Sequence, residues 1–368
     1  MKRVFCLSLI LLLLSFNLNA YAISAKSAVV INGDTGEILY SKDADIKMPM
    51  ASTTKIMTAL LLCEYGNFDR EITVTEDMVR VEGTSMGLLP GDKVTLHDLL
   101  YGMLLCSGND AANAIAVSVA GSVPDFVGMM NSKAKELNLS NTSFETPSGL
   151  DGENHYTTAF ELALITKKAF EYSEFTNAVA SKTATLCYGN PPYNRTLSNH
   201  NKLLKMYDDV VGVKTGFTKK SGRCLVSASK KDGKFVIAVT LNDKDDWADH
   251  RELLDIGLSS VSLNDIEAYE SSLDVINGQK PSFDVHSDST VISSKSGADI
   301  KTETYLPMFL YAPVKSGETV GYRLIFSDGN EAERQEIKSS RDIKLKKIKK
   351  SKRVIEILFS ILRSINEG

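Results

Sequence analysis

The distribution of hydrophobic residues predicts helices and strands up to about residue 262 and mainly strands beyond it. Three predominantly apolar stretches are expected to be helical: 56–62, 96–105 and 111–119. Three other apolar runs are expected to be strands: 210–216, 224–229 and 235–240. The last two runs flank Lys231-Asp232-Gly233-Lys234, and an Asp-Gly pair between apolar runs predicts a hairpin.

After about residue 263 the apolar runs become short and are separated by turn sequences such as Lys315-Ser316-Gly317. Four of these runs have strand character: 282–285, 290–292, 308–311 and 319–326. The pattern therefore predicts the α+β fold class, with a large domain over 23–262 and a small all-β domain over 263–337.

The first 22 residues are expected to be a secretory signal peptide. Met1-Lys2-Arg3 supplies a positive start, an apolar run follows from Val4 to Phe16, and Ala20-Tyr21-Ala22 offers a small-residue cleavage site. The alternative is an uncleaved anchor, although the run is shorter than the ~20 residues that span a bilayer. Cleavage after Ala22 would place the mature protein outside the cytoplasm.

The other end of the chain, 338–368, is strongly basic and then amphipathic. Residues 341–353 hold eight basic residues and one acid, Asp342. A helix through this region would gather its apolar side chains on one face: Leu345, Ile348, Ile355, Leu358, Phe359 and Leu362. Such a helix cannot span a bilayer, but it can lie in the interface of an anionic membrane. The alternatives are a disordered basic tail and a helix docked on the domain.

Composition narrows the class of protein further. The formal net charge is −4, so the basic end is a local feature and gives no reason to expect a nucleic-acid partner. Cysteines remain after the leader at 63, 106, 187 and 224, without a Cys-x-x-Cys motif, and their pairing is left open. Since the histidines at 97, 155, 200, 250 and 286 form no ligand cluster, neither a metal nor a cofactor is expected.

Three short motifs follow one another along the chain: Ser52-Thr53-Thr54-Lys55, Ser107-Gly108-Asn109 and Lys214-Thr215-Gly216. Each alone is compatible with a structural role, as a helix cap, a polar loop that caps a helix, or the end of a strand. Together, and in this order, they match the active-site motifs of serine β-lactamases and penicillin-binding proteins.

The elements expected around the motifs explain what each motif can do. Ser52 falls at a helix N-terminus, where free backbone N–H groups favour developing negative charge, and Lys55 follows one turn later on the same face. A lysine in a dry site near a second cation can lose its proton and act as a base. Lys214 falls on a strand, and an edge strand beside a cleft could pair with an extended peptide.

The second motif is expected in the break between two helices. Glycine permits a tight turn, so we expect Gly108 to direct the Ser107 hydroxyl and the Asn109 amide into the same cleft.

The chain resembles the low-molecular-mass penicillin-binding proteins, which are serine D-alanyl-D-alanine carboxypeptidases. The likeness covers most of the mature chain, and its quoted stretches are 48–58, 107–112, 147–151, 199–204, 214–218 and, in the β domain, 311–317. It implies the transpeptidase fold of penicillin-binding proteins and β-lactamases. The amphipathic C-terminus resembles the family's membrane anchor, which would hold the enzyme on the outer face of the cytoplasmic membrane.

The resemblance also implies a two-step reaction. Ser52 would attack the D-alanyl-D-alanine end of a peptidoglycan stem pentapeptide, release D-alanine, and pass its acyl group to water; β-lactams would acylate the same serine. Lys55 would act as the base, Ser107 would relay a proton to the leaving amine, and Lys214 would tune the electrostatics. Asn109 would bind an amide of the substrate, and Thr215, with Gly216 beside it, would bind the terminal carboxylate. The backbone N–H groups of Ser52 and Phe217 would form the oxyanion hole. His200 and Arg195 would be further contacts to the carboxylate.

Other functions remain open at this point. A class A β-lactamase usually has Ser-Asp-Asn as its second motif and a Glu-x-x-Leu-Asn motif, whereas Glu145 here is followed by Thr146-Pro147-Ser148. A D,D-endopeptidase would use the same site on crosslinked stems, and the sequence does not separate it from a carboxypeptidase. A catalytically silent wall-binding protein is disfavoured by the three intact motifs. Phe217 stands where the family often has a polar residue, which predicts a changed substrate preference.

Overall fold

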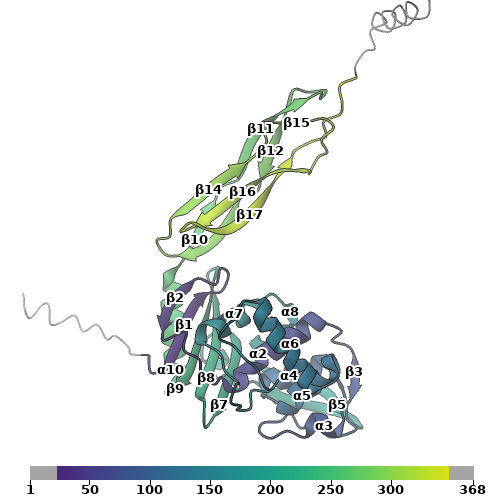
Figure 1. Ribbon diagram of the computed structural model, residues 1–368, viewed down its shortest axis with the longest axis vertical. Coiled ribbons are helices and arrows are strands. Elements are labelled where there is room, and N and C mark those ends of the chain that lie inside the picture. Colours follow the sequence, from purple (N-terminus) through teal and green to yellow (C-terminus); the bar gives the residue numbers. More distant parts are fainter. Residues whose placement is uncertain (1–22, 348–368) are drawn as a thin grey trace, which may run out of the picture. The chain divides into compact units, whose positions relative to one another are not determined.

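The structure is a computed structural model that describes residues 23–347. The expected signal peptide and residues 348–368 of the expected membrane-associating segment lie outside the described residues. The described chain forms two compact units, one ending at Ser262 and the other beginning at Leu263, and each is treated by itself below (Figure 1). Its four cysteines are free, with Cys63 and Cys224 buried.

The first unit is built on a five-stranded sheet in the order β2-β1-β9-β8-β7. All neighbouring strands are antiparallel, with the following bounds: β1 Ser27–Asn32, β2 Ile38–Lys42, β7 Val210–Thr218, β8 Gly222–Lys231 and β9 Lys234–Asp243. The Asp-Gly hairpin is confirmed, because Asp232 and Gly233 both have positive φ, as the tight turn between β8 and β9 requires. Strand β7 lies at the edge of the sheet, which leaves one side of its backbone free for other contacts.

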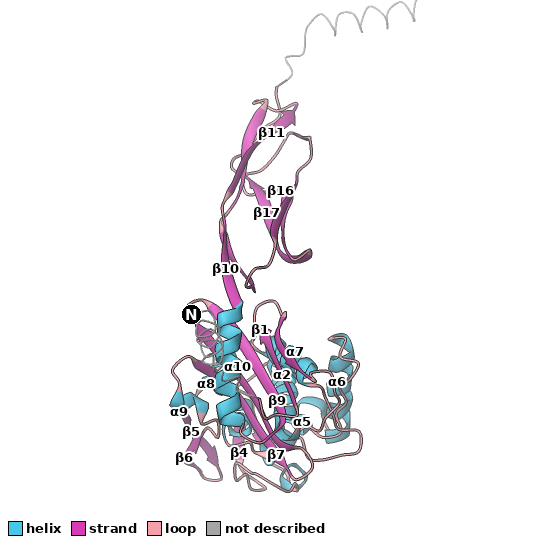
Figure 2. Cartoon of the chain, turned by 90° about the vertical axis from the view of Figure 1, so that its left-hand side faces the viewer, coloured by secondary structure: helices cyan, strands magenta, loops and turns pink. Residues whose placement is uncertain are grey.

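Both faces of this sheet are covered, so its strands are apolar on both sides. Helix α10 (Asp246–Ser260) packs on one face, against Ala28 and Val30 of β1 (Figure 2). Val29 and Ile31 point to the opposite face and join the large core that includes helices α2 (Lys55–Tyr65) and α7 (Ala159–Ala169). Successive side chains of a strand alternate between faces, so a run of buried residues reports burial on both sides.

Most of the remaining helices form the layer beyond α2, whereas the short helix Leu203–Met206 lies against β7 and shares the core of α10. The expected helices are present as α2, α4 (Leu96–Leu105) and α5 (Asn109–Ala120), and Gly121 ends α5 with a φ of 86°. The others are η1 Ala51–Thr54, α3 Glu76–Val79, α6 Val123–Glu136, α8 Ser173–Ala180 and α9 Leu203–Met206. A second, four-stranded sheet in the order β3-β4-β5-β6 adds β3 Glu71–Thr73, β4 Lys93–Thr95, β5 Thr183–Gly189 and β6 Pro192–Ser198. No single helix within 23–347 is long and apolar enough to cross a membrane, although α5 and α6 together pass by length and composition with a bend of 84°.

The second unit consists of strands. A six-stranded sheet has the order β14-β16-β17-β12-β11-β15, and β10 pairs with β13. Their bounds are β10 Val261–Ile266, β11 Tyr269–Ile276, β12 Ser282–Ser287, β13 Thr290–Lys295, β14 Ile300–Tyr305, β15 Phe309–Tyr311, β16 Thr319–Ser327 and β17 Asn330–Ser339. Its core gathers alternate residues of these strands, such as Leu273, Val275, Phe283 and Ile337.

The end of this unit differs from the sequence analysis, which ended the β domain at 337 and placed Leu345 on an amphipathic helix. Ile343 is buried in the β core and pairs with Val314, while Leu345 forms a β-bridge with Gly278. The backbone N–H of Lys346 then donates to the Asn277 carbonyl at 2.7 Å. Since these backbone groups already pair with the β unit, a helix that includes Leu345 is wrong.

Candidate active site

A cleft of about 610 Å³ in the first unit brings the three motifs together. Its lining includes six residues expected at the site: Ser52, Ser107, Asn109, His200, Thr215 and Phe217. Gly216 also lines it, while Lys55 and Lys214 are buried close by, at 0% and 1% exposure. Residues that are far apart in sequence therefore meet in one concave site, which is the usual form of a small-ligand site.

Ser52 lies in the short 3-10 helix η1 that leads into α2, as expected for a helix start. The residue before it, Ala51, has a φ of 48°, so the turn that presents Ser52 is held in the left-handed region. Two glycines make room for this turn. A Cβ on Gly149 would lie 2.0 Å from the Ala51 carbonyl oxygen, and a Cβ on Gly216 would lie 3.0 Å from the Ser52 nitrogen. Gly216 thus allows the edge strand β7 to lie against the Ser52 turn.

The Lys55 ammonium is fully enclosed by three acceptors. Its Nζ donates to Ser52 Oγ at 2.9 Å, to Asn109 Oδ1 at 2.7 Å and to the Ser148 carbonyl at 2.6 Å. Burial, followed by the charge of Lys214, holds the pKa of Lys55 well below its usual range, against a smaller opposing effect of Asp110. The neutral amine, which can accept a proton from Ser52, is therefore populated at a lower pH than for a lysine in water.

The backbone conformation of the second motif differs from the one expected. Ser107 takes the left-handed conformation, with a φ of 63°, whereas the φ of Gly108 is −56°. Gly108 is needed for close approach, because a Cβ there would lie 2.8 Å from Asp110 Oδ1 and 3.0 Å from the Met86 nitrogen. The prediction that Gly108 supplies the turn conformation is wrong, although Ser107 and Asn109 do face the cleft as expected.

Asn109 is held by hydrogen bonds to loop 82–88. Its backbone N–H donates to the Thr84 carbonyl at 2.7 Å, and its Nδ2 donates to the Glu82 carbonyl at 2.6 Å. The side-chain oxygen is thereby turned toward Lys55. Loop 82–88 therefore orients Asn109, and nothing in the three motifs indicates this.

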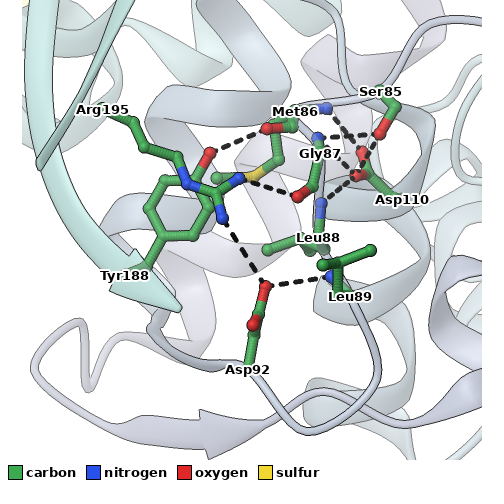
Figure 3. A network of polar contacts seen from close by, with 9 residues as sticks. All are labelled: Ser85, Met86, Gly87, Leu88, Leu89, Asp92, Asp110, Tyr188 and Arg195. Carbon is green, nitrogen blue, oxygen red and sulfur yellow. Dashed lines mark hydrogen bonds and ion pairs between the residues drawn. The ribbon is translucent and has the colours of Figure 1, made fainter. Parts of the chain in front are cut away.

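The neighbouring residue, Asp110, holds this loop in turn (Figure 3). Its carboxylate accepts hydrogen bonds from the backbone N–H groups of Met86, Gly87 and Leu88, at 2.9, 3.1 and 3.0 Å, and from the Ser85 hydroxyl at 2.5 Å. A carboxylate surrounded by several donors is strongly stabilised where it is buried. Asp110 is 2% exposed, so it anchors loop 82–88 to the start of α5.

Arg195 does not contact the cleft, so its expected role at a substrate carboxylate is wrong. Its guanidinium lies 4.3 Å from the ring centre of Tyr188 and 4.3 Å from that of Tyr193. It also donates to the Gly87 carbonyl at 2.8 Å, as Figure 3 shows beside Tyr188. The side chain is therefore already held by stacking and by loop 82–88, with Asp92 at 4.0 Å.

Lys214 and Thr215 point to opposite sides of β7, as expected for successive strand residues. The Lys214 Nζ donates to the Thr215 carbonyl at 3.0 Å, and burial lowers the pKa of Lys214 to about 8, against the opposing effect of Cys106. Thr215 faces the cleft, and Phe217 is 66% exposed at its rim. The edge strand thus offers a hydroxyl and free backbone groups to a ligand.

The cleft residues that the sequence analysis did not find include Gly83 and Thr84 of loop 82–88, and also Arg223, Asp246 and Trp247. Arg223, which lies opposite Phe217 in the β7–β8 pair, forms an ion pair with Asp246, and its guanidinium lies 5.7 Å from the Trp247 ring centre. The only sequence signal is the strand pairing, which places Arg223 beside the third motif. His200 lines the same cleft, where burial, and then the charge of Lys214, lower its pKa.

Replacing Asp110 with asparagine should weaken the site through loop 82–88. The asparagine Nδ2 is itself a donor, so it cannot accept hydrogen bonds from the backbone N–H groups that face it. One lost charge-assisted hydrogen bond corresponds to about 2 kcal/mol of unfolding free energy. Because the Asp110 charge raises the pKa of Lys55, its removal should also shift the rise of the acylation rate to lower pH. Urea denaturation measures the loss of unfolding free energy, and stopped-flow acylation across pH measures the shift.

The matched control is Asp92→Asn, because Asp92 belongs to the same network but accepts from the Leu89 N–H alone among backbone donors. It should leave the pH profile in place. An unchanged pH profile and an unchanged unfolding free energy in the Asp110 variant would contradict the role of Asp110 in positioning loop 82–88.

The fold, together with the three motifs gathered in one cleft, is that of the class of serine β-lactamases and penicillin-binding proteins. Within residues 23–347 there is no group of three His, Cys, Asp or Glu side chains placed to hold a metal ion.

Comparison with known proteins identifies the family. The family model for D-alanyl-D-alanine carboxypeptidase matches residues 15–245. A D-alanyl-D-alanine carboxypeptidase of Bacillus subtilis is 32% identical over 335 residues, which is 87% of this chain and 86% of that protein. One from a Streptomyces species, strain K15, is 36% identical over 60% of this chain and 81% of its own length. The chain belongs to the D-alanyl-D-alanine carboxypeptidase family.

Solved structures agree with this assignment. Penicillin binding protein 5 from Haemophilus influenzae superposes with a TM-score of 0.68 at 26% identity, over 89% of this chain and 100% of that one. The resemblance, the expected α+β transpeptidase fold and the expected activity are therefore confirmed: the chain is a serine-type D-alanyl-D-alanine carboxypeptidase.

Proposed function

We propose that Ser52 is the nucleophile that removes the terminal D-alanine from a peptidoglycan stem pentapeptide. Ser52 Oγ attacks the carbonyl carbon of the penultimate D-alanine while its proton passes to Lys55. The peptide C–N bond then breaks, and D-alanine leaves with that proton on its amine. Water hydrolyses the ester on Ser52 and restores the hydroxyl. The observation that carries this proposal is the 2.9 Å contact between Lys55 Nζ and Ser52 Oγ, made by a buried lysine.

The other motif residues support the proton transfers and the substrate. We assign Ser107, which faces the cleft, to the relay of the proton to the leaving amine, and Lys214 to the local electrostatics. Asn109 orients Lys55 in the free enzyme. Its Nδ2 carries a second hydrogen beyond the one given to Glu82, so the side chain can still donate to a substrate amide.

The terminal carboxylate of the substrate needs positive charge and hydrogen-bond donors. We assign Thr215 and the Arg223 guanidinium to this group, with His200 as a further donor, because all three line the cleft. The backbone N–H groups of Ser52 and Phe217 would form the oxyanion hole, in which one donor typically contributes ~3 kcal/mol to the transition state. Only the backbone of Phe217 is needed there, so its exposed ring is free to affect substrate preference.

Sequence features at the two ends of the chain support a proposed location. The relatives are named as D-alanyl-D-alanine carboxypeptidases, and Met1–Ala22 has the features of a leader. We propose that the leader is removed after Ala22 and that the basic amphipathic segment, from about residue 348, lies in the surface of an anionic membrane. The enzyme would then act on the cell-wall side of the cytoplasmic membrane.

The test uses the mature protein with fluorescent penicillin and two substrates. Peptide mapping should find the label on Ser52 alone, and D-alanine release should be faster from a linear pentapeptide than cleavage of a crosslinked stem. A label on another residue would overturn the assignment of the nucleophile. Faster cleavage of the crosslinked stem would favour the D,D-endopeptidase alternative instead.

A further inference from the structure

One end of the β unit carries a group of exposed apolar side chains. Met308 is 89% exposed, Tyr311 64%, Leu345 53%, Phe309 42% and Ile276 37%. We call these five residues the tip cluster. Exposed apolar side chains are unremarkable when scattered, but several that adjoin one another mark an interaction surface.

The strand register brings the members of the tip cluster together. Strand β15 pairs with β11 in parallel, so Phe309 lies beside Asp274 and Tyr311 beside Ile276. Val275 and Leu310 point inward to the β core, and alternation therefore turns Ile276, Phe309 and Tyr311 outward. The rings of Phe309 and Tyr311 lie 5.6 Å apart, centre to centre.

Leu345 reaches the same end through its bridge to Gly278, which follows closely after Ile276 in the chain. Met308 directly precedes β15 and is the most exposed of these residues. The tip cluster is thus formed by the end of β11, by β15 and by the last described residues, at the end of the unit opposite β10 (Figure 1).

Basic residues border the tip cluster. Lys280, Lys344, Lys346 and Lys347 are exposed on the two segments that pair here, since the Gln279 N–H donates to the Lys344 carbonyl at 2.9 Å. The carboxylates near these segments include Asp274, beside Phe309, Asp342, which accepts from the Ser316 N–H, and Glu318, which accepts from the Lys315 N–H. The lysines outnumber these carboxylates, so the surface combines apolar and aromatic groups with positive charge.

We propose that the tip cluster is a membrane-contacting surface, which inserts its apolar side chains into the interface of an anionic lipid bilayer while the lysines meet the headgroups. Tyrosine, phenylalanine and methionine suit this interface, and a cluster of lysines is attracted to anionic lipid. The proposal rests on the proposed membrane association of the C-terminal segment. That segment begins directly after Lys347, so both contacts would engage one membrane and reinforce each other.

A second copy of the chain is a poorer occupant, because pairing two tip clusters would bring their lysines together. The C-terminal segment itself carries many basic residues, so folding back over the tip cluster would also place like charges close to one another. Anionic lipid is the occupant with complementary charge.

The test compares two double variants of the full mature chain. Phe309→Ser with Tyr311→Ser removes the aromatic side chains of the tip cluster. The matched control, Leu263→Ser with Val291→Ser, removes exposed apolar side chains from β10 and β13 at the other end. Partition to vesicles of phosphatidylglycerol and phosphatidylcholine should fall about tenfold or more for the tip variant and less than twofold for the control. D-alanine release in solution should stay unchanged in both.

A local readout separates the tip cluster from the C-terminal segment. A tryptophan at Tyr311→Trp should be quenched by brominated lipid in anionic vesicles, whereas one at Val291→Trp should not. Wild-type partition by the tip variant, without quenching at 311, would overturn this inference while leaving the C-terminal anchor intact. Failure of the wild type to bind vesicles would instead overturn the underlying membrane proposal. Dimers lost in the tip variant, or a C-terminal segment that becomes protease-sensitive only in it, would identify a second copy or that segment as the occupant.

Discussion

Replacing Ser52 with alanine should abolish covalent labelling by penicillin and lower the rate of D-alanine release by on the order of 10⁴-fold or more. In the proposed mechanism the acyl group bonds to Ser52 Oγ, which is the only hydroxyl among the three hydrogen-bond acceptors of Lys55 Nζ. Lys55 would keep its bonds to Asn109 and Ser148, so the fold should remain intact. Gel fluorescence and a D-alanine assay measure the two losses.

Ser107→Ala is the matched control, because it removes the same atom from a second serine of the same cleft. It should slow acylation while still allowing the label to form. The nucleophile would be assigned wrongly if the Ser52 variant still labelled covalently, or if the two variants lost the label to the same extent.

The features of the site that are local in sequence could be predicted. The spacing of three between Ser52 and Lys55 places them on one helical face, and the structure has them in contact. The strand that carries Lys214 and the hairpin after it follow from apolar runs and an Asp-Gly turn. These predictions succeeded because backbone geometry alone relates residues a few positions apart.

Features that depend on distant parts of the chain could not be predicted. The Ser148 carbonyl, the third acceptor of Lys55, lies 93 positions away in sequence. Asp110 follows the second motif directly, but its partners in loop 82–88 become visible only in the fold. Arg195 was misjudged for the same reason: an arginine near a motif suggests an anion site, whereas here two tyrosine rings already enclose it.

The strands β5 and β6 were missed for a different reason. Ala184, Leu186 and Tyr188 of β5 do alternate with more exposed residues, so this strand carried a signal that was not used, whereas β6 is mostly polar and is exposed or half-buried throughout. Hydrophobic patterning reports burial, and a strand that buries little leaves little signal. The same limit applies to the C-terminal end, where Leu345 looked like part of a helix because its pairing partner, Gly278, is distant in sequence.

Replacing Lys55 with methionine should slow the acylation of Ser52 by about 10²- to 10⁴-fold, the usual contribution of a general base. Methionine fills much of the same volume but cannot accept the proton of Ser52. Lys231→Met is the matched control, because Lys231 is exposed at the hairpin turn between β8 and β9. It should leave the acylation rate unchanged. A Lys55 variant that acylated at the wild-type rate would show that another group takes the proton.

The pH dependence of the acylation rate should separate the proposed roles of Lys55 and Lys214. Acylation by the wild type should rise with pH as Lys55 loses its proton, and fall as Lys214 loses its charge, at a pKa of about 8. The positive charge of Lys214 lowers the pKa of Lys55, so Lys214→Gln should move the rising limb to higher pH and remove the falling limb. Interacting groups titrate together, so each limb of the pH profile reports on Lys55 and Lys214 as a pair. Only the shift of the limbs in the Lys214 variant separates the roles of the two lysines. If Lys214→Gln leaves both limbs in place, Lys214 does not tune the base, and the low pKa of Lys55 must arise from burial alone.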